Sequence, residues 1–172
     1  MSASDLEIAK SEALGRSRGG FSTKIHLQVE GKGRPMALHL SEGQVHESTQ
    51  MQATLDAVRV PRPGKGRPRK RPVRVLTDMA YRGKGCRQAL RSRRISALIP
   101  TQERERLARK KKGSDGGRPF FFDKQEYKKR NVVERCINKL KQFRRVATRY
   151  DKRAQNYLAF ITFASILIWL RS

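Results

Sequence analysis

Apolar and polar residues alternate along residues 22–29, near the start of this 172-residue chain. The alternation divides the side chains between two faces: Thr23, Ile25, Leu27 and Val29 on one, and Lys24, His26 and Gln28 on the other. A period of two is typical of a strand with one buried face. The Gly-rich residues 30–34 follow, and residues 35–40 are again apolar, so we predict a β-hairpin with a five-residue loop.

The rest of the chain alternates between helical and extended patterns. In chain order, we predict a helix over residues 48–58 with Ser48 as its N-cap, a strand over 73–77, a helix over 84–93, a strand over 96–99, a helix over 123–145 and a helix over 152–170. Residues 59–72 and 101–119 are basic, Gly- and Pro-containing connections, and we expect the second to be mobile. This order predicts an α/β fold with helices packed on a mixed sheet.

The first 13 residues differ from the rest of the chain. They are mildly acidic, through Asp5, Glu7 and Glu12, whereas the chain becomes basic and Gly-rich from Leu14 onward. No pattern in residues 1–13 is typical of a strand. We therefore predict a disordered leader over residues 1–13 and a domain over residues 14–172.

The net charge of the chain indicates which class of molecule it binds. The chain carries 40 Lys and Arg against 15 Asp and Glu, a net charge of +25, which favours a polyanion because binding releases its counterions. A ribosomal or basic peripheral membrane protein would share these bulk properties. The longest apolar run, residues 157–170, is shorter than the ~20 residues of a bilayer span, and no secretory signal precedes it. We expect a buried helix there, no membrane association, and a cytoplasmic protein.

Two acidic residues are candidates for chemistry. Asp78 follows the predicted strand 73–77, and ligands bind beyond the carboxyl ends of strands in open α/β sheets. A turn or cap residue is the competing interpretation of Asp78. Glu134 lies on the predicted long helix and is the only acid between Tyr127 and Arg149. A solvated charged face is the competing interpretation there.

The predicted long helix separates polar from apolar side chains. At 100° per residue, one stripe about 60° wide contains Tyr127, Arg130, Glu134 and Lys141. A second, apolar stripe that can pack on a sheet contains Val132, Val133, Cys136, Ile137, Leu140 and Phe143. Other groups are weaker candidates: a zinc site at His26, His39 and His46 lacks a fourth ligand, and Cys86 and Cys136 are expected to be buried apolar side chains.

The spacing Tyr127-x2-Arg130-x3-Glu134-x6-Lys141 resembles the YREK signature of bacterial insertion-sequence transposases of the DDE type. Four further blocks are similar to that family in the same order: residues 15–26, 61–72, 78–81 and 131–135. The resemblance covers residues 14–171. Five ordered blocks make it specific, whereas four spaced residues could match by chance.

The resemblance implies an RNase H-like catalytic domain that cleaves and transfers strands of transposon-end DNA, in the nucleoid of a bacterial cell. In that family three carboxylates hold two Mg²⁺ ions, one helping to generate the attacking oxygen and the other stabilising the leaving oxygen. Asp78 would be the second carboxylate and Glu134 the third. The residues implied or expected to contact DNA are Tyr127, Arg130, Lys141, Arg16, Arg18, Arg67, Arg69, Lys70 and Arg71.

One departure from the family concerns its first catalytic aspartate, which precedes the segment similar to residues 15–26. Only 14 residues precede Gly15 here, and none of their acids lies in an apolar strand. We therefore expect the first strand and its aspartate to be missing, with little catalysis by this chain alone. Frameshifting in the family suggests a downstream product or a truncated copy, which could pair with an upstream-frame product or full-length transposase. The alternative function is a non-catalytic, basic DNA-binding regulator of transposition.

Overall fold

An antiparallel hairpin forms most of the larger sheet in the computed structural model, which describes residues 12–171. Strands β2 (Gly20–Val29) and β3 (Pro35–Glu42) pair with Ile25 opposite Leu40 and Leu27 opposite Leu38. The predicted hairpin is thus confirmed, and β3 is two residues longer than predicted. A short strand, β1 (Gly15–Ser17), pairs with the start of β2 and was not predicted. Residues 1–11, most of the predicted leader, lie outside the described residues.

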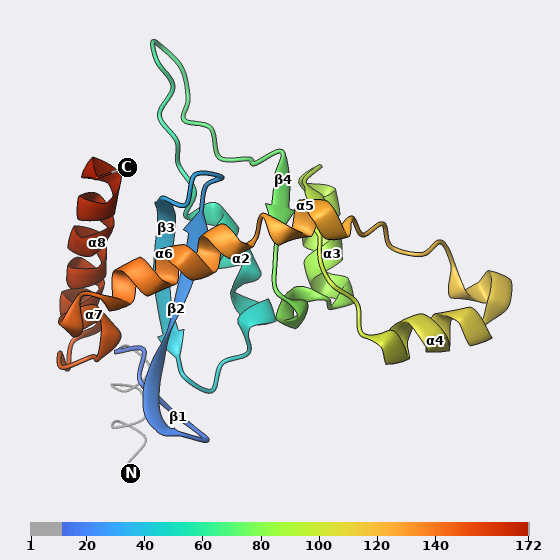
Figure 1. The fold of residues 1–172 in the computed structure, drawn as a ribbon, viewed down its shortest axis with the longest axis horizontal. Helices are drawn as coiled ribbons and strands as arrows, with labels where there is room; N and C mark the ends of the chain where they lie inside the picture. The colour runs from blue at the N-terminus through green and yellow to red at the C-terminus, as the bar shows by residue number, and fades with distance from the viewer. Residues whose placement is uncertain (1–11, 172) are drawn as a thin grey trace. The chain divides into compact units, whose positions relative to one another are not determined.

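The chain divides into two units (Figure 1). The first contains the three-stranded sheet and the C-terminal helices; the second is Arg71–Arg130. The mixed α/β character is as predicted, but the described strands form two sheets, because β4 (Arg74–Leu76) and β5 (Ser96–Leu98) pair only with each other, in parallel. Among the described residues, no helix combines the length and apolar character needed to cross a membrane.

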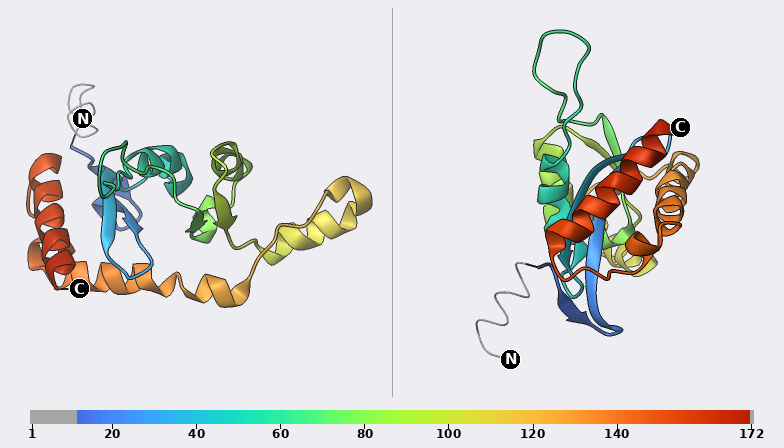
Figure 2. Two further views of the ribbon diagram at one scale, coloured as in Figure 1. Left: turned by 90° about the horizontal axis from the view of Figure 1, so that it is seen from above. Right: turned by 90° about the vertical axis from the view of Figure 1, so that its left-hand side faces the viewer.

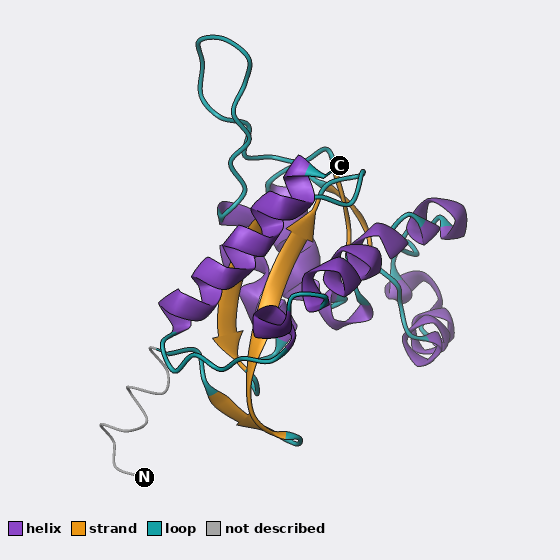
Figure 3. Ribbon diagram, turned by 60° about the vertical axis from the view of Figure 1, so that its left-hand side comes forward, coloured by secondary structure: helices purple, strands orange, loops and turns teal. Residues whose placement is uncertain are grey.

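The apolar face of the hairpin carries the core of the first unit. Helices α6 (Asn131–Lys141), α7 (Arg144–Ala147) and α8 (Ala154–Leu170) contribute its buried side chains, and Figures 2 and 3 show α8 lying across the strands. These side chains are Cys136, Leu140, Val146, Tyr157, Ile161, Ala164 and Ile168, packed against Ile25, Leu27, Val29, Leu38 and Leu40. The predicted burial of α8 is confirmed on this side, whereas Phe163, Ile166 and Leu170 on its outer side are exposed.

The polar face of the hairpin is covered too, contrary to the half-buried strand that alternation predicts. Helix α2 (Met51–Asp56) packs there through Met51 and Leu55. His26 is only 4% exposed; its ring stacks on His39 with centroids 4.5 Å apart and shares a 2.7 Å hydrogen bond with Ser41 Oγ. Burial, with a smaller contribution from His39, lowers the pKa of His26 from 6.5 to about 4.

The helix predicted from Ser48 begins differently. A 3₁₀ turn, Glu47–Gln50, precedes α2, and His46 is its N-cap: the His46 imidazole accepts a hydrogen bond from Ser48 N. Sequence preference pointed to Ser48 because hydroxyls usually cap helices. An imidazole nitrogen with a free lone pair can accept from a backbone amide in the same way, and at His46 the donor is the amide of Ser48.

The predicted long helix over residues 123–145 is wrong, because the chain forms three helices there. Asp123 is the N-cap of α5 (Lys124–Lys128) and accepts hydrogen bonds from the amides of Gln125 and Glu126. The amides of Lys129 and Arg130 then bond to carbonyls three residues back, which tightens the last turn and ends α5. Helix α6 starts at Asn131, and the longest helix of the fold is α8, with 17 residues.

The second unit packs α3 (Lys84–Ser92) on the β4–β5 pair through Cys86, Leu90, Ile95, Leu98 and Ile99, all buried. Helix α4 (Glu103–Lys111) occupies the connection predicted to be mobile. Its charges explain why a helix forms despite the absence of an apolar face: Glu103 and Glu105 lie in its first turn, and three cations lie in its last turn. Both placements complement the helix dipole.

Acidification should destabilise the first unit through His26. Because the folded pKa of about 4 lies below the usual 6.5, the unfolded chain takes up this proton first as the pH falls. The contribution of neutral His26 to the free energy of unfolding is fully present above pH 6.5. It is lost as the pH drops toward 4, and the loss is on the order of 3 kcal/mol. Urea unfolding at a series of pH values measures this pH dependence of the unfolding free energy. His26→Gln should flatten this dependence, whereas His46→Gln, at an exposed imidazole, should retain it. Equal slopes for wild type and His26→Gln would contradict the assignment.

Candidate active site

Asp78 lies at the carboxyl end of the parallel strands of the second unit. The amide of Thr77 bonds to Leu98 O at 3.2 Å, which continues the β4–β5 ladder to the residue before Asp78. Asp78 begins the 3₁₀ turn Met79–Tyr81 through its backbone, but its carboxylate makes no capping hydrogen bond and is 60% exposed. The carboxylate therefore faces solvent at the strand ends, the position at which open α/β sheets bind ligands.

Two residues of the Tyr–Arg–Glu–Lys pattern meet this strand end. Arg130 Nη2 lies 3.7 Å from Asp78 Oδ2, and the Tyr127 hydroxyl donates to Thr77 O at 3.2 Å. Helix α5 is held beside β4 by an ion pair between Glu126 and Arg74, 3.4 Å apart. The Arg130–Asp78 contact is long and partly solvated, so it orients the carboxylate rather than contributing much stability.

Glu134 and Lys141 lie on the other unit, on α6. Both side chains are exposed, and their spacing of seven residues places them about 20° apart on one side of the helix. Cys136 and Leu140 bury the opposite side, but Ile137, predicted in the apolar stripe, is 36% exposed. The single polar stripe predicted from Tyr127 to Lys141 does not exist, because the break at residues 129–130 separates two helices.

The metal-binding potential of the described residues is limited to scattered carboxylates. Within residues 12–171, no group of three or more His, Cys, Asp and Glu side chains could hold a metal ion. Asp78 and Glu134 offer exposed carboxylate oxygens, the donors that Mg²⁺ prefers, and they belong to different units. Both cysteines are buried, as predicted, and burial raises the pKa of Cys136 to about 11, which disfavours the thiolate.

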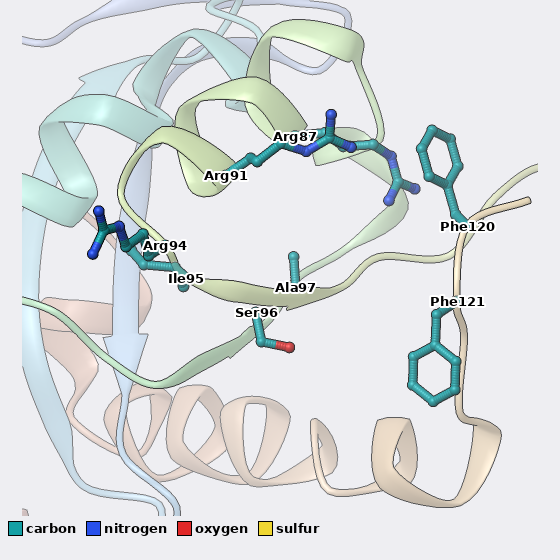
Figure 4. Close-up of a pocket in the computed structure, with 8 residues that line it drawn as sticks. All are labelled: Arg87, Arg91, Arg94, Ile95, Ser96, Ala97, Phe120 and Phe121. Carbon is teal, nitrogen blue, oxygen red and sulfur yellow. The ribbon is translucent and has the colours of Figure 1, made fainter. Parts of the chain in front are cut away.

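A cavity of about 350 Å³ beside β5 was missed by sequence reasoning (Figure 4). Its basic and aromatic lining includes Arg91, Arg94 and Phe121, and the ring of Phe120 lies under the guanidinium of Arg87, 3.8 Å from its centroid. Arginine and phenylalanine side chains together bind phosphates and stack on bases in nucleic-acid-binding proteins. The signal available in the sequence was the run of three phenylalanines at residues 120–122 following a basic segment.

The remaining candidate cations are on the surface. Arg16 lies in β1, Arg18 lies in the turn between β1 and β2, and both are exposed. Four more exposed cations follow the tip of the connection after α2: Arg67, Arg69, Lys70 and Arg71. Exposed cations of this kind are accessible to the phosphates of a bound polyanion.

Comparison with known proteins identifies relatives. The family model described as the transposase DDE domain matches residues 7–169. A protein of Burkholderia cepacia described as a transposase for insertion sequence element IS402 is 33% identical over 153 residues, covering 89% of this chain and 64% of that relative. A Brucella ovis protein described as a transposase for insertion sequence element IS6501 is 27% identical over 151 residues, covering 88% of this chain and 100% of that relative. This chain therefore spans less than two thirds of the first relative. No solved structure matches.

Replacing Tyr127 by Phe should loosen the link between α5 and β4. The variant removes the hydrogen bond to Thr77 O but retains the ring, which packs against Phe122 with centroids 5.0 Å apart. We expect a loss of about 1 kcal/mol in unfolding free energy and faster hydrogen exchange at β4. Tyr150→Phe is the matched control, because Tyr150 is 56% exposed in the first unit. Unchanged exchange at β4 in Tyr127→Phe would show that this bond does not hold the two elements together.

Proposed function

Because the chain belongs to the transposase DDE domain family, we propose that it is the catalytic part of an insertion-sequence transposase. In this proposal it has an RNase H-like fold and carries out magnesium-dependent cleavage and strand transfer of transposon-end DNA. The observation that carries the proposal is the arrangement around Asp78. Tyr127 and Arg130 lie far from it in sequence, yet both reach the end of β4 that presents its carboxylate.

The proposed roles follow from the chemistry of each side chain. Asp78 and Glu134 would bind magnesium, which supplies positive charge to the phosphodiester during displacement. Arg130 orients the Asp78 carboxylate, and Tyr127 holds the end of α5, the helix that directly precedes Arg130, beside β4. Lys141, exposed on the same side of α6 as Glu134, would contact a DNA phosphate. We assign Glu134 from its place in the Tyr–Arg–Glu–Lys pattern, four residues after Arg130.

We further propose that another strand completes the site with the first catalytic aspartate. Among the described strands, β1 pairs only with Gly20–Ser22 of β2, and β3 pairs with the opposite edge over residues 23–29. Residues 23–29 therefore have one edge without a described strand partner, and such edges pair readily with a further strand. A segment encoded upstream, joined by frameshifting or supplied by an upstream-frame product or a full-length transposase, would provide that strand.

DNA would be held by the exposed cations of both units. The net charge of +25 predicts strong attraction to any duplex, with counterion release as the main contribution. Arg16, Arg18, Arg67, Arg69, Lys70 and Arg71 are the proposed DNA contacts of these surfaces. The cavity lined by Arg91 and Phe121 would accept an unpaired nucleotide of the strand end.

The catalytic assignment is tested with the chain fused to the segment encoded directly upstream. This fusion should nick transposon-end duplex only when Mg²⁺ is present. Asp78→Asn and Glu134→Gln should each reduce nicking by at least about 10³-fold, since one carboxylate of the metal set is removed, and leave DNA binding within about twofold. Asp115→Asn, at an exposed acid near α4, is the control and should retain activity. Full activity in the Glu134→Gln fusion would exclude Glu134 from catalysis.

The second candidate function is a DNA-binding regulator without catalysis, favoured by the same charge of +25. It predicts salt-sensitive binding of DNA by the chain and no nicking by the fused protein under any metal condition. Nicking that requires Asp78 excludes this alternative, whereas tight binding with an inactive fusion supports it. Both outcomes are measured on the same transposon-end duplex, and the sequence that flanks the transposon end does not affect them.

A further inference from the structure

The connection after α2 forms a closed loop that projects from the first unit (Figure 1). Two backbone hydrogen bonds join its ends: Val60 N donates to Arg69 O at 2.9 Å, and Arg69 N donates to Val60 O at 2.7 Å. We call residues 61–68 the basic loop. Every residue of the basic loop is exposed. The loop therefore has an anchored base and a tip that extends into solvent.

The chain of the basic loop is thin at its two glycines, which carry no side chain, and is restrained at its prolines. Pro61, Pro63 and Pro68 limit the backbone angle φ, and Gly64 and Gly66 have φ of +92° and +148°, in the region that favours glycine. A Cβ added at either glycine would meet nothing within 4 Å, so no protein atom crowds this part of the chain. A restrained loop of small cross-section loses less conformational entropy on binding than a flexible one.

Charge on the loop has a single sign. Three cations lie in the loop and three more lie at its base: Arg62, Lys65 and Arg67, then Arg59, Arg69 and Lys70. No acid occurs between Asp56 and Asp78. This charge density fits a polyanion, and the small cross-section selects for a polyanion with a narrow groove.

From these features we propose that the basic loop binds the minor groove of DNA and prefers A·T-rich sequence. The segment Gly66–Arg67–Pro68 has no Cβ at its first residue and no N–H at its third, so its backbone can approach the groove floor closely. The planar Arg67 guanidinium enters the groove, while cations at the loop base contact the flanking phosphates. A·T-rich minor grooves are narrow and have an enhanced negative potential that attracts arginine.

The DNA minor groove fits these features better than other polyanions do. The minor groove of duplex RNA is wide and shallow, so a narrow loop would contact one wall only. An anionic membrane offers charge without a groove, and the loop lacks the apolar side chains that insert into lipid. The inference concerns a site separate from Asp78 and Glu134, and it holds whether or not the chain is catalytic.

Three duplexes of equal length test the proposal by fluorescence anisotropy on the full chain at one salt concentration. Their central segments contain A·T, G·C or inosine·C pairs. Inosine·C has the major-groove pattern of G·C but lacks the guanine amino group in the minor groove. We expect the chain to bind the A·T and inosine·C duplexes about equally, and each about tenfold more tightly than the G·C duplex.

Arg67→Ala should abolish this preference, so that the three duplexes bind equally. Arg104→Ala on α4 removes the same charge from an exposed position and should keep the tenfold preference. Because Arg67 lies in the exposed loop, Arg67→Ala should fold like the wild-type chain, and an unchanged circular dichroism spectrum verifies this. The proposal is overturned if the wild-type chain binds the A·T and G·C duplexes equally, or if the inosine·C duplex binds like the G·C duplex. It is also overturned if the preference survives in Arg67→Ala, or if a duplex RNA binds as tightly as the A·T duplex. An absence of nicking activity would leave these binding results unchanged. A failure of the proposed catalytic function can therefore be distinguished from a failure of the proposed groove binding.

Discussion

Packing of three helices on one face of the β2–β3 hairpin holds the first unit together. Ile161 of α8 is fully buried there, and Cys136 and Leu140 of α6 lie in the same cluster. Because this packing fixes which side of α6 is buried, Glu134 and Lys141 are left exposed together on another side. Hydrophobic burial thus determines where the charged residues of the helix can act.

A second constraint is the excess of positive charge. With 40 cations and 15 acids, the cations outnumber the acids by 25, and some of the described ion pairs position elements. Glu126 joins α5 to Arg74 of β4, and Arg130 from the same segment reaches Asp78. The second unit therefore presents a carboxylate in strongly basic surroundings, which suits the proposed binding of metal and DNA.

The elements that sequence analysis predicted correctly are those whose apolar residues form a clear local pattern. The hairpin, α3, α8 and both short parallel strands follow from local patterning. The break after Lys128 was missed because residues 123–145 keep a helical period across it, and a pattern cannot reveal that two amides bond three residues back. Strand β1 was missed because its sequence, Gly–Arg–Ser, contains no apolar side chain that would indicate a buried face, and α4 because it buries no apolar side chain.

For the candidate site, the sequence by itself determined the residue types, their spacing and the likeness to a transposase family, since these depend only on chain order. Only the tertiary structure decided that Tyr127 and Arg130 meet the end of β4, a contact across about 50 residues that local propensity does not encode. It also decided that His26 is buried on a face with a polar pattern, because α2 packs there. Local periodicity specifies which face of an element is apolar, whereas the packing of distant elements decides which polar side chains stay in water.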